Sequence, residues 1–153
     1  MSPFDFVPGA RHEPLYLEHF LVEVWRFQSV GRDDDARRLL ASVWSWAMDD
    51  VASEQDVRVA ARLLERLAFV TDDAEGWQAL PDELVIYRAE TSPAEPTRGL
   101  CWTLDHEIAE RNAILHGLSV TRGRVSKAAV RAYITGYGEE EIVVERAHVK
   151  HET

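Results

Sequence analysis

Apolar residues in the first seventy positions recur at the spacing of amphipathic helices. Between Glu13 and Gln28 they return about every three or four residues, which places them on one helix face, and Gly31 is suited to end this helix. The acidic residues at 33–35 predict the start of a second helix, because negative charge stabilises the N-terminal end of a helix dipole. Ser53 is expected to cap a third helix. The pattern predicts a small helical bundle without a reactive motif.

The third helix is expected to be covered on two sides. A second apolar line accompanies its main stripe and consists of Val59, Leu63 and Val70. The following segment, 71–81, is rich in turn-forming residues. Within it, Trp77 and Leu80 are expected to pack on the helices. Because exposing these apolar faces would be costly, we expect the helical region to pack against the rest of the chain.

After Pro81 the pattern changes from helices to strands. Short runs of β-branched residues bounded by turn formers predict strands at 84–88, 100–103, 118–125, 131–134 and 141–144. A helix from Leu104 to about His116, capped by Thr103, interrupts them. This order predicts an α+β protein: an N-terminal helical bundle, residues 1–80, followed by a compact α+β core, residues 81–153.

Composition narrows the class of protein. The chain has 153 residues and a net charge of −10, with 27 acidic against 17 basic residues, which weighs against nucleic acid as a partner. The single cysteine, Cys101, cannot close an intrachain disulfide, as suits a reducing cytosol. No apolar run approaches the roughly 20 residues that span a bilayer, and the N-terminus lacks a signal pattern. We therefore expect a soluble cytoplasmic protein without a membrane partner.

A cluster of three glutamates opens the last predicted strand. Gly138 is followed by Glu139, Glu140, Glu141 and then by β-branched residues, which predicts a turn that leads into a strand. Because side chains alternate along a strand, Glu139 and Glu141 share one face and Glu140 points to the other. Two glutamates separated by one residue are, on their own, also typical of a solvated acidic turn. Whether they form part of a site therefore depends on the segments upstream.

Two upstream segments join this cluster in a recognisable order: Ile86-Tyr87-Arg88, Gly99-Leu100-Cys101-Trp102-Thr103, and then Glu139-Glu140-Glu141. With these segments the chain resembles the arginine–serine–glutamate class of ADP-ribosyltransferases, which includes many bacterial toxins and phage-encoded enzymes. That family has an arginine ending its first core strand, a Ser-Thr-Ser-like strand and a Glu-x-Glu strand. The resemblance covers roughly residues 81–149 and implies a core of two small sheets.

The resemblance also implies a role for each site residue. Glu141 would stabilise the oxocarbenium-like state that forms when NAD loses nicotinamide, and Glu139 would deprotonate an acceptor, usually a protein arginine. Arg88 would bind the NAD diphosphate through its planar guanidinium. Thr103 and Cys101 would position the nicotinamide side. Cysteine and tryptophan stand where the family has Ser and Thr, and a thiol is a weaker hydrogen-bonding group than a hydroxyl.

Each site residue has a structural alternative. Arg88 could pair with a surface carboxylate such as Glu90, Thr103 could serve as a helix cap, and Cys101 could be a small buried apolar residue. The tryptophans at 25, 44 and 46 are expected in the bundle core or at the domain interface. The sequence His106-Glu107-Ile108-Ala109-Glu110 lacks the second histidine of a zinc-protease helix, so no metal site is predicted.

Three functional hypotheses follow from these patterns. The first is an NAD-dependent mono-ADP-ribosyltransferase that modifies a protein side chain, such as an effector encoded by a phage or mobile element, with NAD as substrate and no metal. The second is a non-catalytic interaction protein with a degenerate ADP-ribosyltransferase-like core. In the third, the strands merely complete a helical bundle. The enzyme requires Arg88, Thr103 and Glu141 to face one cleft.

Overall fold

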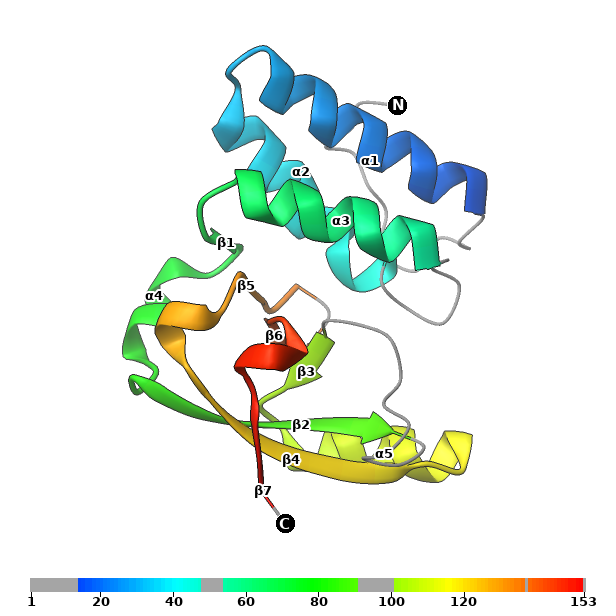
Figure 1. The fold of residues 1–153 in the computed structure, drawn as a ribbon, viewed down its shortest axis with the longest axis vertical. Helices are drawn as coiled ribbons and strands as arrows, with labels where there is room; N and C mark the ends of the chain where they lie inside the picture. Colours follow the sequence, from blue (N-terminus) through cyan, green and yellow to red (C-terminus); the bar gives the residue numbers. More distant parts are fainter. Residues whose placement is uncertain (1–13, 48–53, 91–100, 137, 153) are drawn as a thin grey trace.

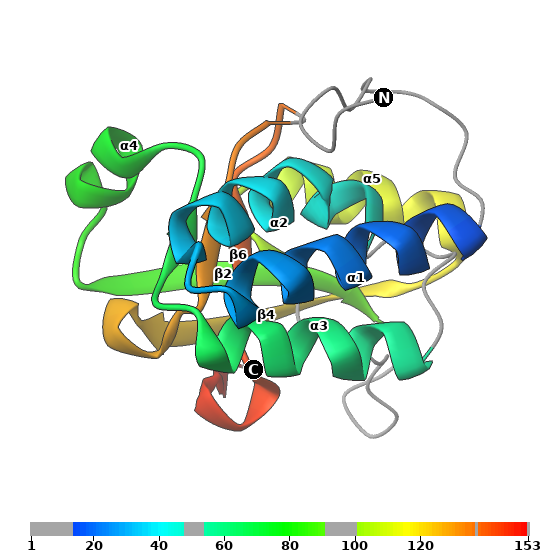
Figure 2. The ribbon, with the colours of Figure 1, turned by 90° about the horizontal axis from the view of Figure 1, so that it is seen from above.

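The computed structural model describes residues 14–47, 54–90, 101–136 and 138–152 of the chain. Three helices come first: α1 (Pro14–Ser29), α2 (Asp33–Ala47) and α3 (Glu54–Arg66). They lie side by side over one face of a β-sheet (Figures 1 and 2). The predicted helical spans are confirmed within the described residues, while the predicted cap Ser53 lies outside them.

Gly31 ends α1 as the sequence predicts. Its φ of 78° lies in the left-handed region that glycine adopts without strain. The amide of Gly31 donates to the carbonyl of Gln28 at 3.1 Å, and the amide of Arg32 donates to the carbonyl of Phe27 at 2.8 Å. These bonds satisfy carbonyls at the end of α1, and α2 then begins with its three aspartates.

The sheet contains seven strands among the described residues. They are β1 (Val70–Thr71), β2 (Glu83–Glu90), β3 (Cys101–Thr103), β4 (Ser119–Ser126), β5 (Ala132–Ile134), β6 (Glu141–Val143) and β7 (Lys150–Glu152). The order across the sheet is β1-β5-β6-β3-β2-β4-β7, with β1 parallel to β5 and every other pair antiparallel. Strands that are far apart in the sequence, β2, β3 and β6, are therefore neighbours.

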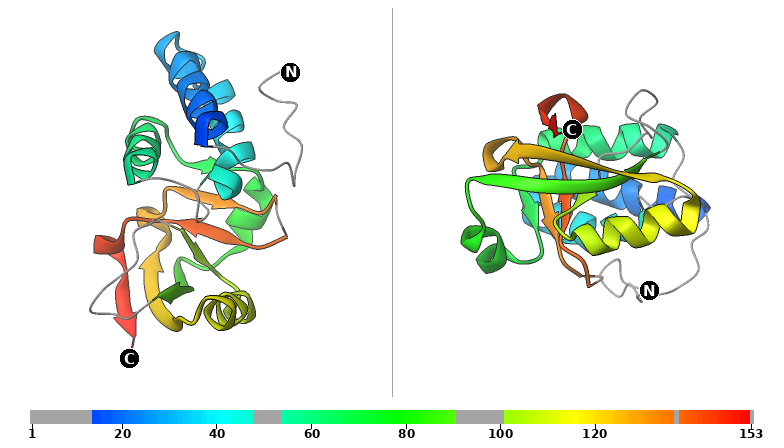
Figure 3. Two further views of the ribbon diagram at one scale, coloured as in Figure 1. Left: turned by 90° about the vertical axis from the view of Figure 1, so that its right-hand side faces the viewer. Right: turned by 90° about the horizontal axis from the view of Figure 1, so that it is seen from below.

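The described strands form one continuous sheet, so the expectation of two small sheets is wrong for them. The reason lies in β3, which pairs with β2 on one side and with β6 on the other. This bridging strand joins the long twisted pair of β2 and β4 to the shorter strands near the helices (Figures 1 and 3). The predicted α+β class is confirmed.

Two apolar clusters cover opposite faces of the sheet. The first joins the helices to the strands, because Phe20, Leu40, Trp44 and Leu63 pack in one cluster with residues of β1, β5 and β6. The second lies on the other face and includes Ile86, Trp102, Ile142 and Val144. Side chains from the helical region thus pack directly on strands, and β1, from within residues 1–80, is itself part of the sheet.

Three packing expectations are wrong, one of them for Trp25, which was expected in the bundle core or at the domain interface and is 50% exposed. Trp77 and Leu80 pack on the second cluster and not on the helices, because the short helix α4 (Ala74–Ala79) places them on the far face of the sheet. There Trp77 stacks on Phe69 with ring centroids 4.6 Å apart. Val59 is 37% exposed and Val70 lies in β1, beyond the end of α3, so only Leu63 of the predicted second line is a buried residue of the helix.

Helix α5 (His106–His116) lies against β2, β3 and β4. Its N-cap is Asp105 and not the predicted Thr103: the carboxylate of Asp105 accepts from the amide of Glu107 at 2.9 Å. The threonine hydroxyl instead accepts from the amide of Asp105 at 3.1 Å, because Thr103 stands two residues before the N-cap position. None of the described helices is both long and apolar enough to cross a membrane.

Candidate functional site

A pocket of about 330 Å³ opens between α5 and the adjoining strands β2, β3 and β6. All five residues singled out in the sequence line this pocket: Arg88, Cys101, Thr103, Glu139 and Glu141. The convergence on one cleft that an enzyme would require is therefore present. Their chemical roles stay predictions.

The strand register explains how distant residues meet. Thr103 lies opposite Tyr87 on β2 and opposite Glu141 on β6. Cys101, two residues before Thr103, points to the same face, and Trp102 points to the opposite face, where it packs in the second cluster. β3 thus holds the carboxylate strand on one side and the arginine strand on the other.

Glu141 is buried, with 5% of its surface exposed, and contacts Cys101, which in turn contacts the helices. Burial raises the pKa of the Cys101 thiol well above its ordinary value, and the charge of Glu141 and a hydrogen bond to it add to this effect. The indole of Trp44 on α2 donates to the sulfur of Cys101 at 3.3 Å. Cys101 is therefore a protonated donor to Glu141, and not only a small apolar residue.

Glu139 has different surroundings although it lines the same pocket. It is half-buried, and burial, followed by the nearby charge of Asp105, raises the pKa of its carboxyl group. The intervening Glu140 is exposed and accepts a hydrogen bond from the hydroxyl of Tyr133 at 2.7 Å. The predicted alternation of the three glutamates is confirmed, with Glu139 and Glu141 on the pocket side.

Arg88 lies across the start of β3. Its guanidinium donates to the carbonyl oxygen of Cys101, and its Nε lies 3.4 Å from Oε1 of Glu90. The side chain is only 14% exposed. Burial lowers its pKa, yet an arginine in a protein stays charged. The pairing with Glu90 considered from the sequence is thus present, together with a place on the pocket wall.

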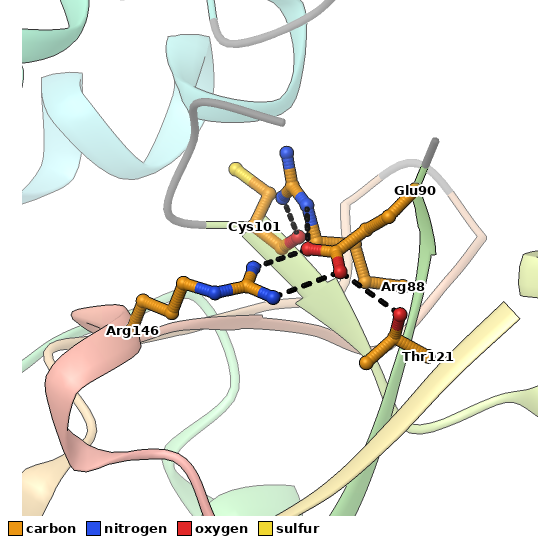
Figure 4. A network of polar contacts seen from close by, with 5 residues as sticks. All are labelled: Arg88, Glu90, Cys101, Thr121 and Arg146. Carbon is orange, nitrogen blue, oxygen red and sulfur yellow. Dashed lines mark hydrogen bonds and ion pairs between the residues drawn. The ribbon is translucent and has the colours of Figure 1, made fainter. Parts of the chain in front are cut away.

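Glu90 itself is not a surface carboxylate, because its side chain is fully buried. Arg146, from the short helix η2 (Arg146–His148), binds both of its oxygens, with one contact at 2.9 Å, and the hydroxyl of Thr121 donates to Oε2 at 2.9 Å (Figure 4). Burial alone would raise the pKa of Glu90, but these hydrogen bonds and the two arginine charges hold it below the ordinary value. Sequence reasoning missed Arg146 and Thr121.

The opposite wall of the pocket comes from α5. Ile108, Asn112 and His116 line it, at the spacing of one helix face. Tyr87 on β2 also lines the pocket and meets the ring of His106 edge to face, with centroids 4.9 Å apart. These residues give the pocket a mixed aromatic and polar wall that the sequence motifs did not identify.

Among the residues that the structure describes, no group of three or more His, Cys, Asp or Glu side chains could hold a metal ion. A comparison with protein-family models, with curated proteins and with solved structures finds no match to this chain. Function is therefore argued from the chemistry of the pocket.

Proposed function

We propose that the chain is an NAD-dependent mono-ADP-ribosyltransferase that modifies a protein side chain, with arginine as the favoured acceptor. One observation carries the proposal. Three strands that adjoin in the sheet, β2, β3 and β6, bring the motif residues Arg88, Cys101, Thr103, Glu139 and Glu141 to one pocket. These are the residues to which the resemblance gives a common site.

The buried carboxylate fits the bond-breaking step. The bond between the ribose and nicotinamide of NAD breaks with its electron pair moving to the nicotinamide nitrogen, which leaves positive charge on the ribose. Glu141 would stabilise that charge by its own negative charge, from a buried position. The thiol of Cys101, a donor to Glu141, would hold the carboxylate in place.

The second carboxylate fits the transfer step. Glu139 would take a proton from the acceptor guanidinium, and the nitrogen that loses this proton would attack the ribose carbon. The raised pKa of Glu139 makes its carboxylate a stronger base than an ordinary glutamate. With NAD and the acceptor as reactants, the products are the ADP-ribosylated side chain, nicotinamide and a proton.

Arg88 fits the anionic part of the same substrate. Arg88 is among the residues that line the pocket, and its guanidinium reaches the start of β3, where it donates to the carbonyl of Cys101. A planar guanidinium suits the diphosphate of NAD. The pocket volume of about 330 Å³ is at the low end of ligand sites. We therefore expect the pocket to hold the nicotinamide and its ribose, while the adenosine lies toward the surface.

The direct test is release of nicotinamide from NAD by the purified protein, with and without cell lysate as a source of acceptors. We expect slow release alone and faster release with an acceptor, accompanied by ADP-ribose on a protein band. If the protein neither binds NAD nor releases nicotinamide in any lysate, the proposal fails. The alternative of a non-catalytic interaction protein with a degenerate core would then replace it.

A further inference from the structure

We propose that Glu90 and Arg146 form a buried clamp that holds Arg88 in the orientation needed to bind the pyrophosphate of a dinucleotide. That the ligand is a dinucleotide rests on the proposed function, while the clamp itself rests on the contacts of the three side chains. Glu90 and Arg146 would act as positioning residues, because neither lines the pocket.

The geometry of Glu90 supports this role. Its side chain has no exposed surface, and its two oxygens receive contacts from two guanidinium groups and one hydroxyl (Figure 4). Arg146 approaches from η2, Thr121 from β4, and Arg88 from two residues earlier on β2 itself. A buried carboxylate is costly unless it is paired and hydrogen-bonded, so all of these contacts hold Glu90 in one position.

The clamp fixes Arg88 from two directions. Its Nε lies 3.4 Å from Glu90, and its Nη1 donates to the carbonyl of Cys101. A long arginine side chain loses rotamer entropy when it binds a ligand. Ordering it before the ligand arrives reduces that loss and therefore strengthens binding.

Arg146 contributes a second restraint. Its guanidinium binds both oxygens of Glu90 and lies 5.8 Å from the ring of Trp102, on the other side of β3 from the pocket residue Cys101. Removal of Arg146 would take away the contacts that hold both oxygens of Glu90 in place, so Glu90 would no longer be fixed beside Arg88. We expect this change to move Arg88 away from the pocket.

The test compares the affinity for NAD of the wild type and of Glu90→Gln, which keeps the shape of the side chain and removes its charge. We expect Glu90→Gln to weaken NAD binding about tenfold, the effect of losing one charge-assisted contact, with little change in the rate of nicotinamide release at saturating NAD. Glu83→Gln is the matched control on the same strand, because Glu83 pairs with Arg124 at the surface. Arg146→Gln should reproduce the effect of Glu90→Gln.

A double-mutant comparison separates positioning from general destabilisation. In the Arg88→Ala background, Glu90→Gln should cause no further loss of NAD affinity, because the residue that it positions is absent. A full additional loss in that background, or wild-type affinity in a folded Glu90→Gln protein, would overturn the proposal.

A readout that needs no ligand keeps the clamp testable if the wild type fails to bind NAD. We expect the Nε proton of Arg88 to exchange slowly with water in the wild type, as seen by NMR, and to exchange quickly in Glu90→Gln and Arg146→Gln. Equal exchange rates in all three proteins would contradict the clamp. Absence of NAD binding together with the expected exchange pattern would reject only the proposed function.

Discussion

Two glutamates of the same short segment occupy different environments, as the different tasks proposed for them require. Glu141 is almost fully buried between Thr103 on β3 and Ile134 on β5. Glu139 is half-buried near Asp105 and has a raised pKa.

Replacing Glu141 by Gln tests the electrostatic task. The amide keeps the shape of the side chain but lacks the negative charge that would stabilise the oxocarbenium-like state. We expect nicotinamide release to fall by about 10²–10³-fold, as for loss of one group that stabilises transition-state charge, while the Kd for NAD changes little. A fall in affinity with unchanged maximal rate would contradict this role.

Replacing Glu139 by Gln tests the acceptor task. We expect transfer to protein arginine to fall sharply while slow hydrolysis of NAD by water persists. In the wild type, transfer should decline as pH is lowered through the raised pKa of Glu139, and therefore at a higher pH than for an ordinary glutamate. Glu140→Gln is the control, because Glu140 points away to Tyr133. Equal effects of Glu139→Gln, Glu140→Gln and Glu141→Gln on transfer would argue against separate roles for these glutamates.

Cys101, which stands where the resembling family has serine, allows a further prediction about a single side chain. Serine at position 101 preserves a donor to Glu141, whereas alanine removes it. We expect Cys101→Ser to keep or raise the rate of nicotinamide release and Cys101→Ala to lower it about tenfold or more, as for loss of a hydrogen bond to a charged group. Serine also keeps an acceptor for the indole of Trp44, which alanine removes, so Trp44→Phe is the control that loses this contact alone. Equal rates for Cys101→Ser and Cys101→Ala would contradict the role of the thiol.

At the scale of elements, the sequence predicted those whose side-chain pattern is strong. The stripes of α1 and α2 and the β-branched run after Glu141 predicted their elements to within a few residues. The pattern failed for β1, of two residues, and for β7, whose Lys150, His151 and Glu152 carry no apolar alternation. These strands form through pairing with β5 and β4, which is long-range information that local patterns lack.

The site was predictable to a similar extent. The order of Arg88, Thr103 and Glu141 along the chain indicated one pocket, since each was expected at a strand end. The burial of Glu90 was missed: it was expected at the surface because the predicted strand ended at Arg88, whereas β2 continues to Glu90. Its partner Arg146 was not predictable, because that contact depends on how η2 returns to the sheet.

The N-cap of helix α5, Asp105, affects both the stability of the helix and the charge in the pocket. Asp105 caps the helix and raises the pKa of Glu139 by its charge. We expect Asp105→Ala to lower the free energy of unfolding by about 1 kcal/mol, a common cost of losing a cap. Asp105→Asn keeps a capping oxygen and removes the charge, so the free energy of unfolding should change less. The acidic limb of the pH profile of the transfer rate should move to lower pH, because the pKa of Glu139 falls. If Asp105→Asn leaves that limb unchanged, Asp105 does not influence Glu139.

At the scale of the whole molecule, the helices and the sheet share one core. Leu63 on α3 is 3% exposed and belongs to the cluster that contains Val143 of β6 and contacts Cys101. Trp44 extends this connection to the sulfur of Cys101 in the pocket. The helical region is thus a supporting layer for the strands that carry Cys101 and Glu141, and we expect the two to unfold together.

Leu63→Ala tests this dependence, with Val59→Ala as a matched control on the same helix. Truncating a buried leucine costs about 2–5 kcal/mol, whereas a change at the partly exposed Val59 should cost less. If the core is shared, Leu63→Ala should lower the midpoint of unfolding equally for a helical signal, measured by circular dichroism, and for amide exchange in β6. Coincident transitions are the mark of one cooperative unit. A variant that loses its helices while β6 stays protected would show that the sheet folds alone, and the supporting role of the helices would have to be abandoned.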